Sequence, residues 1–103
     1  MSVINVTKDN FESEVLKSNV PVLADFNAGW CGPCRAMKPM LDELAEGNTA
    51  YKIVSIDIDE EDELADEYDV SSIPCLVVFK GGEEVNRSVG LIAKDAIAEL
   101  VEG

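Results

Sequence analysis

The stretch that decides the fold is residues 22–37, which read VLADFNAGWCGPCRAM. Its first part is almost entirely apolar, which is typical of a central parallel strand covered on both faces, and it predicts a strand over Val22–Asn27. Its second part predicts a helix from about Cys31 to Glu46, with Pro39 inside it as the expected cause of a kink. In sheets of this kind, reactive groups belong in the loop between strand and helix.

The rest of the chain alternates between strand and helix patterns. Further strands are expected over 3–6, 51–58, 75–80 and 83–89, and further helices after Thr7, over 60–68 and over 93–101. Thr7 stands at the expected N-cap, and Gly81-Gly82 at the expected hairpin turn. The order βαβαβαββα predicts an α/β fold, a central mixed β-sheet flanked by helices on both faces. Because there is no linker or repeat, we expect residues 1–103 to form a single domain.

Composition excludes several classes of function. The chain has 103 residues, 47% of them hydrophobic, enough for a core without disulfide or metal staples. Its net charge of -13 repels phosphate and anionic lipid, so we expect no nucleic acid and no membrane partner. The absence of histidine excludes Ser-His-Asp triads and histidine metal sites. With no signal-like start and an odd number of cysteines, the chain is expected to be intracellular.

Two thiols at the strand-to-helix junction carry the chemistry. Cys31 and Cys34 are separated by Gly32 and Pro33, a spacing that places both sulfurs on one side of the first helical turn, where they can close a disulfide. The positive end of the helix dipole favours a thiolate on Cys31, which is the expected nucleophile. Cys34 is expected to be more buried and to act as the resolving thiol. Gly32 and Pro33 should influence the redox poise.

A structural zinc site is the competing interpretation of the same two cysteines. Such a site needs about four ligands. The sequence has no second C-x-x-C pair and no histidine, and Cys75 is its only other thiol. We therefore expect no metal and favour redox chemistry.

Asp25 interrupts the apolar strand six residues before Cys31. Burial would raise its pKa and make it a workable base near neutral pH, one that accepts the proton of Cys34 through water. The alternative is a structural aspartate at a strand end, hydrogen-bonded to the backbone. Both interpretations stay open at this point.

Two further features lie close to the expected site. Pro74, after Ile73, cannot join a central ladder and marks a special backbone feature, for which a cis bond is one option. Trp30 is either an exposed recognition surface or a lid on the dithiol.

An acidic segment follows the third expected strand. Residues 57–69 contain nine acidic side chains and no basic one. A calcium loop is excluded because Asp62 stands where that loop needs glycine and Tyr68 where it needs a bidentate glutamate. The segment is expected to be a solvated helix face that serves partner selection and solubility.

The motif Trp30-Cys31-Gly32-Pro33-Cys34, with Asp25 upstream and Ile73-Pro74 downstream, resembles the thioredoxin family over essentially the whole chain. The resemblance implies a thioredoxin fold and a cytoplasmic, monomeric protein-disulfide reductase whose dithiol is recharged by a thioredoxin reductase. The resemblance further implies that the protein needs no cofactor beyond its redox-active disulfide. It also implies roles for individual residues: Cys31 as attacking thiol, Cys34 as resolving thiol, Asp25 as buried acid, Pro74 as cis-proline, and Trp30, Ile73, Pro74 and Gly90 as the surface that binds disulfide-containing protein substrates.

Three positions depart from the family pattern. Asn27 replaces an aromatic residue, which predicts looser packing under the loop, and Ser55 replaces a lysine, which leaves the pKa of Asp25 more raised. Cys75 replaces a threonine and is expected to be a packing substitute, although a third thiol near the dithiol would also suit a metal or iron-sulfur carrier. The alternative functions are a dedicated electron donor and a redox-independent binding subunit for one specific partner.

Overall fold

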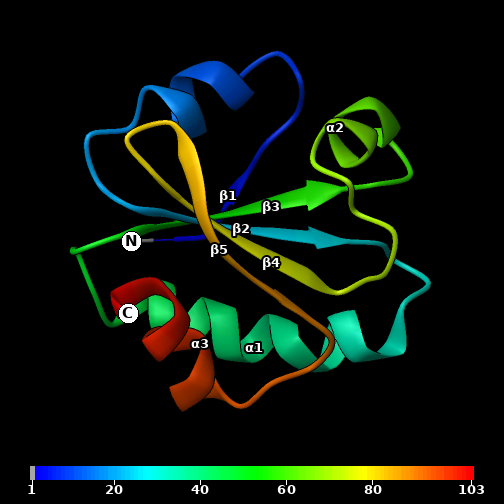
Figure 1. The fold of residues 1–103 in the computed structure, drawn as a ribbon. Helices are drawn as coiled ribbons and strands as arrows, with labels where there is room; N and C mark the ends of the chain where they lie inside the picture. Colours follow the sequence, from blue (N-terminus) through cyan, green and yellow to red (C-terminus); the bar gives the residue numbers. More distant parts are fainter. Residues whose placement is uncertain (1) are drawn as a thin grey trace.

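The structure, a computed structural model, describes residues 2–103. Five strands form one mixed sheet in the order β1-β3-β2-β4-β5 (Figure 1). Their bounds are β1 Ile4–Asn5, β2 Val22–Asn27, β3 Lys52–Asp57, β4 Cys75–Lys80 and β5 Glu83–Val89. The helices are η1 Glu12–Leu16, α1 Gly32–Glu46, α2 Asp62–Glu67 and α3 Lys94–Glu102. The sheet lies between two layers, with η1 and α2 on one face and α1 and α3 on the other (Figure 1). This is the predicted thioredoxin fold.

Two hydrophobic clusters fill the two sides of the sheet. Alternate residues of β2 point to opposite faces: Val22, Ala24 and Phe26 pack in the cluster that includes η1 and α2, whereas Leu23 packs with α1 and α3. The same alternation puts Asp25 on the α1 side. β2 pairs with β3 in parallel and with β4 in antiparallel register, so the strand that carries Asp25 is the centre of the sheet.

The first helix differs from the prediction. Thr7 caps only a turn over residues 8–10: its Oγ1 accepts from the backbone N–H of Asp9 at 3.2 Å, and its own backbone N–H donates to Oδ1 of Asn10 at 2.7 Å. The N-cap of the helix itself is Phe11. The helix begins only at Glu12 and is a single π turn, closed by the N–H of Lys17 on the carbonyl of Glu12 at 2.8 Å. The other boundaries lie within one or two residues of those expected. α1 continues through Pro39, and Gly81 and Gly82 form the predicted hairpin turn with positive φ at both positions.

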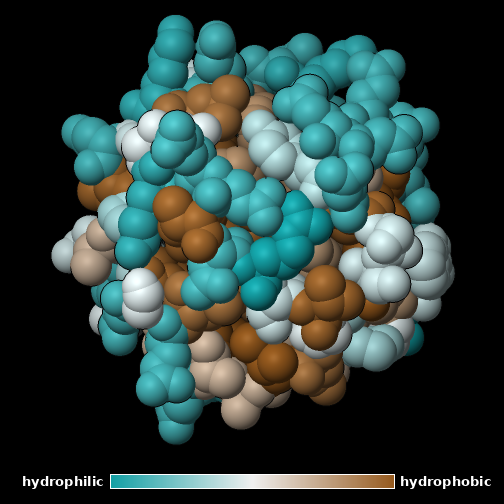
Figure 2. Space-filling view, viewed as in Figure 1, coloured by the Kyte–Doolittle hydropathy of each residue, from teal (hydrophilic) through white to brown (hydrophobic). Residues whose placement is uncertain are grey.

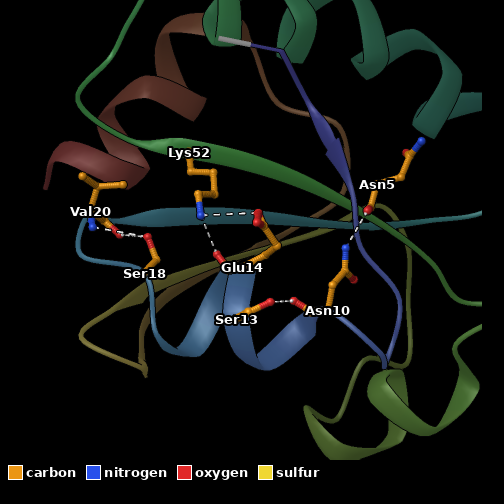
Figure 3. Close-up of polar contacts among 7 residues, drawn as sticks. All are labelled: Asn5, Asn10, Ser13, Glu14, Ser18, Val20 and Lys52. Carbon is orange, nitrogen blue, oxygen red and sulfur yellow. Dashed lines mark hydrogen bonds and ion pairs between the residues drawn. The ribbon is translucent and has the colours of Figure 1, made fainter.

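Lys52 anchors this short helix to the sheet. Its Nζ donates to the backbone carbonyl of Glu14 at 2.9 Å and pairs with the Glu14 carboxylate at 3.6 Å (Figure 3). The Lys52 side chain is only 18% exposed, so the contact is partly protected from solvent. A helix this short has little stability of its own, and its position depends on such contacts and on buried Val15.

The surface is mostly polar. Figure 2 shows apolar patches that interrupt it on the face where β5 lies. The exposed large apolar side chains on or next to β5 are Val85, Val89 and Leu91. Among residues 2–103, no helix is long and apolar enough to cross a bilayer.

Candidate active site

The two cysteines lie at the junction between β2 and α1. Cys31 is the N-cap of α1, and Pro33 occupies the first turn, where its missing N–H costs no helical hydrogen bond. The two thiols form a disulfide, with 5.2 Å between their Cα atoms. The spacing therefore does what the sequence predicts, since both sulfurs meet on the first turn of the helix.

The two sulfurs differ in their relation to the helix end. The backbone N–H of Cys34 donates to Sγ of Cys31 at 3.2 Å. A donor aimed at this sulfur, at the positive end of the helix, stabilises a thiolate on Cys31 rather than on Cys34. Gly32 and Pro33 are exposed and leave this end of the helix open to a partner.

The expectation that Cys34 is the more buried thiol is wrong. Cys31 is 4% exposed and Cys34 is 6% exposed. Both thiols are buried because Ile58 and Ile73, from distant parts of the chain, pack against the cluster that Ala28 forms with both cysteines. Position on the helix, not burial, distinguishes the two sulfurs in the disulfide form.

Asp25 is buried in the centre of the sheet at 6% exposure. Desolvation raises its pKa from 3.8 to about 7, against a smaller lowering by a hydrogen bond from Asn27 and by the charge of Lys38. Its Oδ1 is buried and has no hydrogen-bond partner within the described part of the chain. Within residues 2–103, the group that donates to Oδ2 is the side chain of Asn27 and not a backbone N–H, which argues against the alternative of a backbone-bonded aspartate.

Asn27 and Ser55 surround this carboxylate with neutral groups. Nδ2 of Asn27 donates to Oγ of Ser55 at 2.8 Å, to the backbone carbonyl of Asp25 at 2.9 Å and to Oδ2 of Asp25 at 3.3 Å. Ser55 is the register partner of Asp25 across β2 and β3. The two departures from the family pattern thus form one polar unit.

A cavity of about 560 Å³ opens between β1, β3, the end of β2 and α1. Asp25, Cys34, Asn27, Ser55 and Lys38 all line it. The cavity lies directly under the active-site loop and is wide enough for several water molecules. Sequence reasoning missed Lys38, although its position four residues after Cys34 on the same helix is a signal that both share one face.

The residues expected to bind substrate gather beside the dithiol. The Ile73-Pro74 bond is cis, as the resemblance implies, and the N–H of Gly90 donates to the carbonyl of Pro74 at 2.8 Å. Ile73 packs against the cysteine cluster. Trp30 is 67% exposed, which fits the recognition surface rather than the lid. Its Nε1 donates to Oδ2 of Asp59 at 2.9 Å.

Cys75 lies on the other side of the sheet from Asp25. It packs in the cluster of η1 and α2, it is 1% exposed, and burial raises the pKa of its thiol. Within residues 2–103, no group of three or more cysteine, aspartate or glutamate side chains is arranged to hold a metal ion. The geometry fits a packing residue rather than a third active-site thiol.

Comparisons with known proteins point in one direction. The family profile described as Thioredoxin matches residues 2–103. A thioredoxin from Pyropia yezoensis is 46% identical over 98% of this chain and 95% of its own, and thioredoxin 1 from a Nostoc species is 44% identical over 94% and 92%. A solved mutant thioredoxin from Halobacterium salinarum superimposes with a TM-score of 0.90 at 40% identity, covering 98% of this chain and 88% of its own.

Proposed function

The chain belongs to the thioredoxin family of thiol-disulfide oxidoreductases, and on that premise we propose that it reduces disulfide bonds in other proteins through Cys31 and Cys34. The observation that carries this proposal is the disulfide itself, with the Cys31 sulfur at the N-terminus of α1 and a backbone N–H directed at it. A helix end lowers the pKa of such a thiol and produces the nucleophile that the reaction needs.

The reaction proceeds in two exchanges. The Cys31 thiolate attacks one sulfur of the substrate disulfide, the substrate S–S bond breaks, and the first substrate thiolate leaves. Cys34 then gives up its proton and attacks the Cys31 sulfur, which releases the second substrate thiolate. Two electrons pass to the substrate, its two thiolates take up protons, and this protein ends as the Cys31–Cys34 disulfide.

Asp25 is the proposed acceptor of the Cys34 proton. Its raised pKa of about 7 gives it comparable populations of acid and base at neutral pH, as a proton carrier requires. Asp25 and Cys34 line one cavity, which leaves room for a bridging water. The unpaired Oδ1 is the oxygen available for that proton.

Substrate docking is assigned to Trp30, Ile73, Pro74 and Gly90. The hydrogen bond between Gly90 and Pro74 holds two of these segments together beside the dithiol. An extended substrate segment pairs with the backbone of Ile73, as a strand adds to a sheet edge. Gly32 and Pro33 set the redox poise through the geometry of the ring that the disulfide closes.

Family membership supports a proposal for the physiological cycle. We assign recharging to a thioredoxin reductase, the location to the cytoplasm, and the working form to a single-domain monomer with no cofactor beyond its disulfide. The acidic segment 57–69 supports a narrower alternative, a dedicated electron donor whose partner has a basic surface.

Reduction of insulin disulfides by the protein with dithiothreitol is the direct test. We expect turnover by the wild type and none by Cys31→Ser. Reduced Cys34→Ser, freed of dithiothreitol and then mixed with insulin, should form a trapped mixed disulfide because the resolving thiol is missing. Cys75→Ser is the matched control and should retain activity. Turnover by Cys31→Ser would refute the assignment, and failure of the wild type with insulin would indicate a dedicated donor or a redox-independent binding subunit.

A further inference from the structure

We propose that Asn27, anchored by Ser55, is a positioning residue that holds the Asp25 carboxylate by Oδ2 and leaves Oδ1 free for proton transfer. The inference rests on the proposed function, in which Asp25 takes the proton of Cys34. In this proposal the neutral amide of Asn27 and the hydroxyl of Ser55 stabilise the buried carboxylate of Asp25.

The contacts of the Asn27 amide define its orientation. Three acceptors face it: Oγ of Ser55 at 2.8 Å, the Asp25 carbonyl at 2.9 Å and Oδ2 of Asp25 at 3.3 Å. An amide nitrogen has two N–H groups, so one goes to Ser55 and the other is shared between the two Asp25 oxygens. An amide oxygen in the same place would face two oxygens that cannot donate, the carbonyl and the ionised carboxylate.

The shared N–H is what couples Asn27 to the charge of Asp25. When Asp25 is protonated, the backbone carbonyl is the nearer acceptor; when it ionises, Oδ2 becomes the stronger one because hydrogen bonds to charged groups are the strong ones. The amide thus stabilises the ionised form selectively. Ser55 holds the other N–H and prevents the amide from turning away.

Other charged side chains also line the cavity. Its charged lining groups are Arg35, Lys38, Asp42 and Glu46 of α1 and Asp57 of β3. Lys38 also pairs with Asp42 at 3.4 Å and its side chain is 74% exposed, which weakens its effect on Asp25. On β4, the Cys75 thiol lies on the opposite face of the sheet, and the charge of Asp25 contributes to raising its pKa after burial, the main cause.

The first test is a carboxyl carbon NMR titration of Asp25 in the oxidised protein. In Asn27→Leu, which keeps the volume and removes the donor, the pKa of Asp25 should rise by about one unit, the size expected for losing one hydrogen bond to a charged group. Ser55→Ala should give a smaller rise in the same direction, and it serves if Asn27→Leu does not fold. Asn86→Leu and Ser88→Ala, the same changes on β5, should leave the titration unchanged.

The second test follows the reaction with an aromatic disulfide that releases a coloured thiolate at each exchange. The second release reports the attack by Cys34. In Asn27→Leu the ionised fraction of Asp25 at pH 7 should fall from about one half to about one eleventh. This phase should therefore slow about fivefold at pH 7 and recover to the wild-type rate by about pH 9, where the weaker acid is again ionised. A purely structural defect would slow the phase at every pH.

The two tests separate the inference from the proposed function. An Asp25 titration that does not move in Asn27→Leu or Ser55→Ala overturns the positioning role, whatever the activity. A raised Asp25 pKa combined with an unaltered pH profile of the second release also overturns it, because Asn27 would then support a carboxylate that takes no part in proton transfer. If Asp25→Asn leaves the second phase unchanged, the proposed base fails, while the titration still shows whether Asn27 supports the carboxylate.

Discussion

The indole of Trp30 donates a hydrogen bond to the carboxylate of Asp59 at 2.9 Å, although Trp30 is 67% exposed. The bond ties the active-site loop to the acidic segment that follows β3. It holds a large aromatic ring in one orientation on the surface, where a partner can use it without first ordering it.

Asp59→Ala should release this ring. Because Trp30 is the only tryptophan, its fluorescence anisotropy reports its mobility directly, and we expect a lower value in the variant. Asp62→Ala removes the same charge from the same segment and should leave the anisotropy unchanged. Equal effects of the two changes would mean that charge, rather than this hydrogen bond, orders the loop.

Asp25 should make the folded state less stable as the pH rises. Its pKa is 3.8 in the unfolded chain and about 7 in the folded protein. The loss in free energy of unfolding caused by ionising Asp25 is therefore absent below pH 3.8, grows between these two values and is complete above pH 7. A shift of about 3 units corresponds to about 4 kcal/mol. Asp25→Asn should therefore be more stable than wild type to urea at pH 8, with the difference vanishing at pH 3.5. A constant difference across this range would contradict a buried, titrating Asp25.

Cys75→Ala should affect stability but not redox chemistry. Removing a fully buried sulfur leaves a small cavity, and we expect a loss of about 1 kcal/mol in urea unfolding. The reduction potential of the Cys31–Cys34 couple against glutathione should stay the same because Cys75 packs on the η1 and α2 side of the sheet. A potential that moves would instead bring Cys75 into the thiol chemistry.

The hairpin glycines should not be equivalent. Both have positive φ, 62° at Gly81 and 83° at Gly82, but a Cβ at Gly82 would lie 3.0 Å from the backbone oxygen of Leu16. Gly81→Ala should cost about 1 kcal/mol for the left-handed backbone, and Gly82→Ala clearly more, since η1 must also move. Urea unfolding of the two variants measures the difference. An equal loss in free energy of unfolding would show that the backbone at Leu16 can move aside at little cost.

The sequence could predict what depends on local spacing. Cys31 and Cys34 meet because they are three residues apart at a helix start, and Asp25 and Asn27 share a face because alternate strand residues do. What it could not predict needs contacts between distant segments. Ser55 reaches Asn27 only through the register of β2 and β3, and Ile58 and Ile73 pack against the cysteine cluster from elsewhere in the chain.

Thr7 shows the same limit on a smaller scale. A threonine before an amphipathic stretch favours an N-cap, and the Thr7 hydroxyl does accept the N–H of Asp9, while Asn10 accepts the N–H of Thr7, but these bonds close only one turn. The helix start then moves to Glu12. Hydrophobic periodicity does not reveal whether a capped turn continues directly into the helix.

The neutral surroundings of Asp25 have a consequence for the effect of salt. A cation on an exposed side chain loses its influence as ionic strength rises, whereas a hydrogen bond from a half-buried amide acts at contact and is screened little. Because Asn27 and Ser55 supply the contacts in this chain, the proton transfer should be nearly insensitive to salt. Salt should instead change the rate at which a chain of net charge -13 associates with charged partners. The association rate should therefore depend on ionic strength, whereas the rate of proton transfer should not.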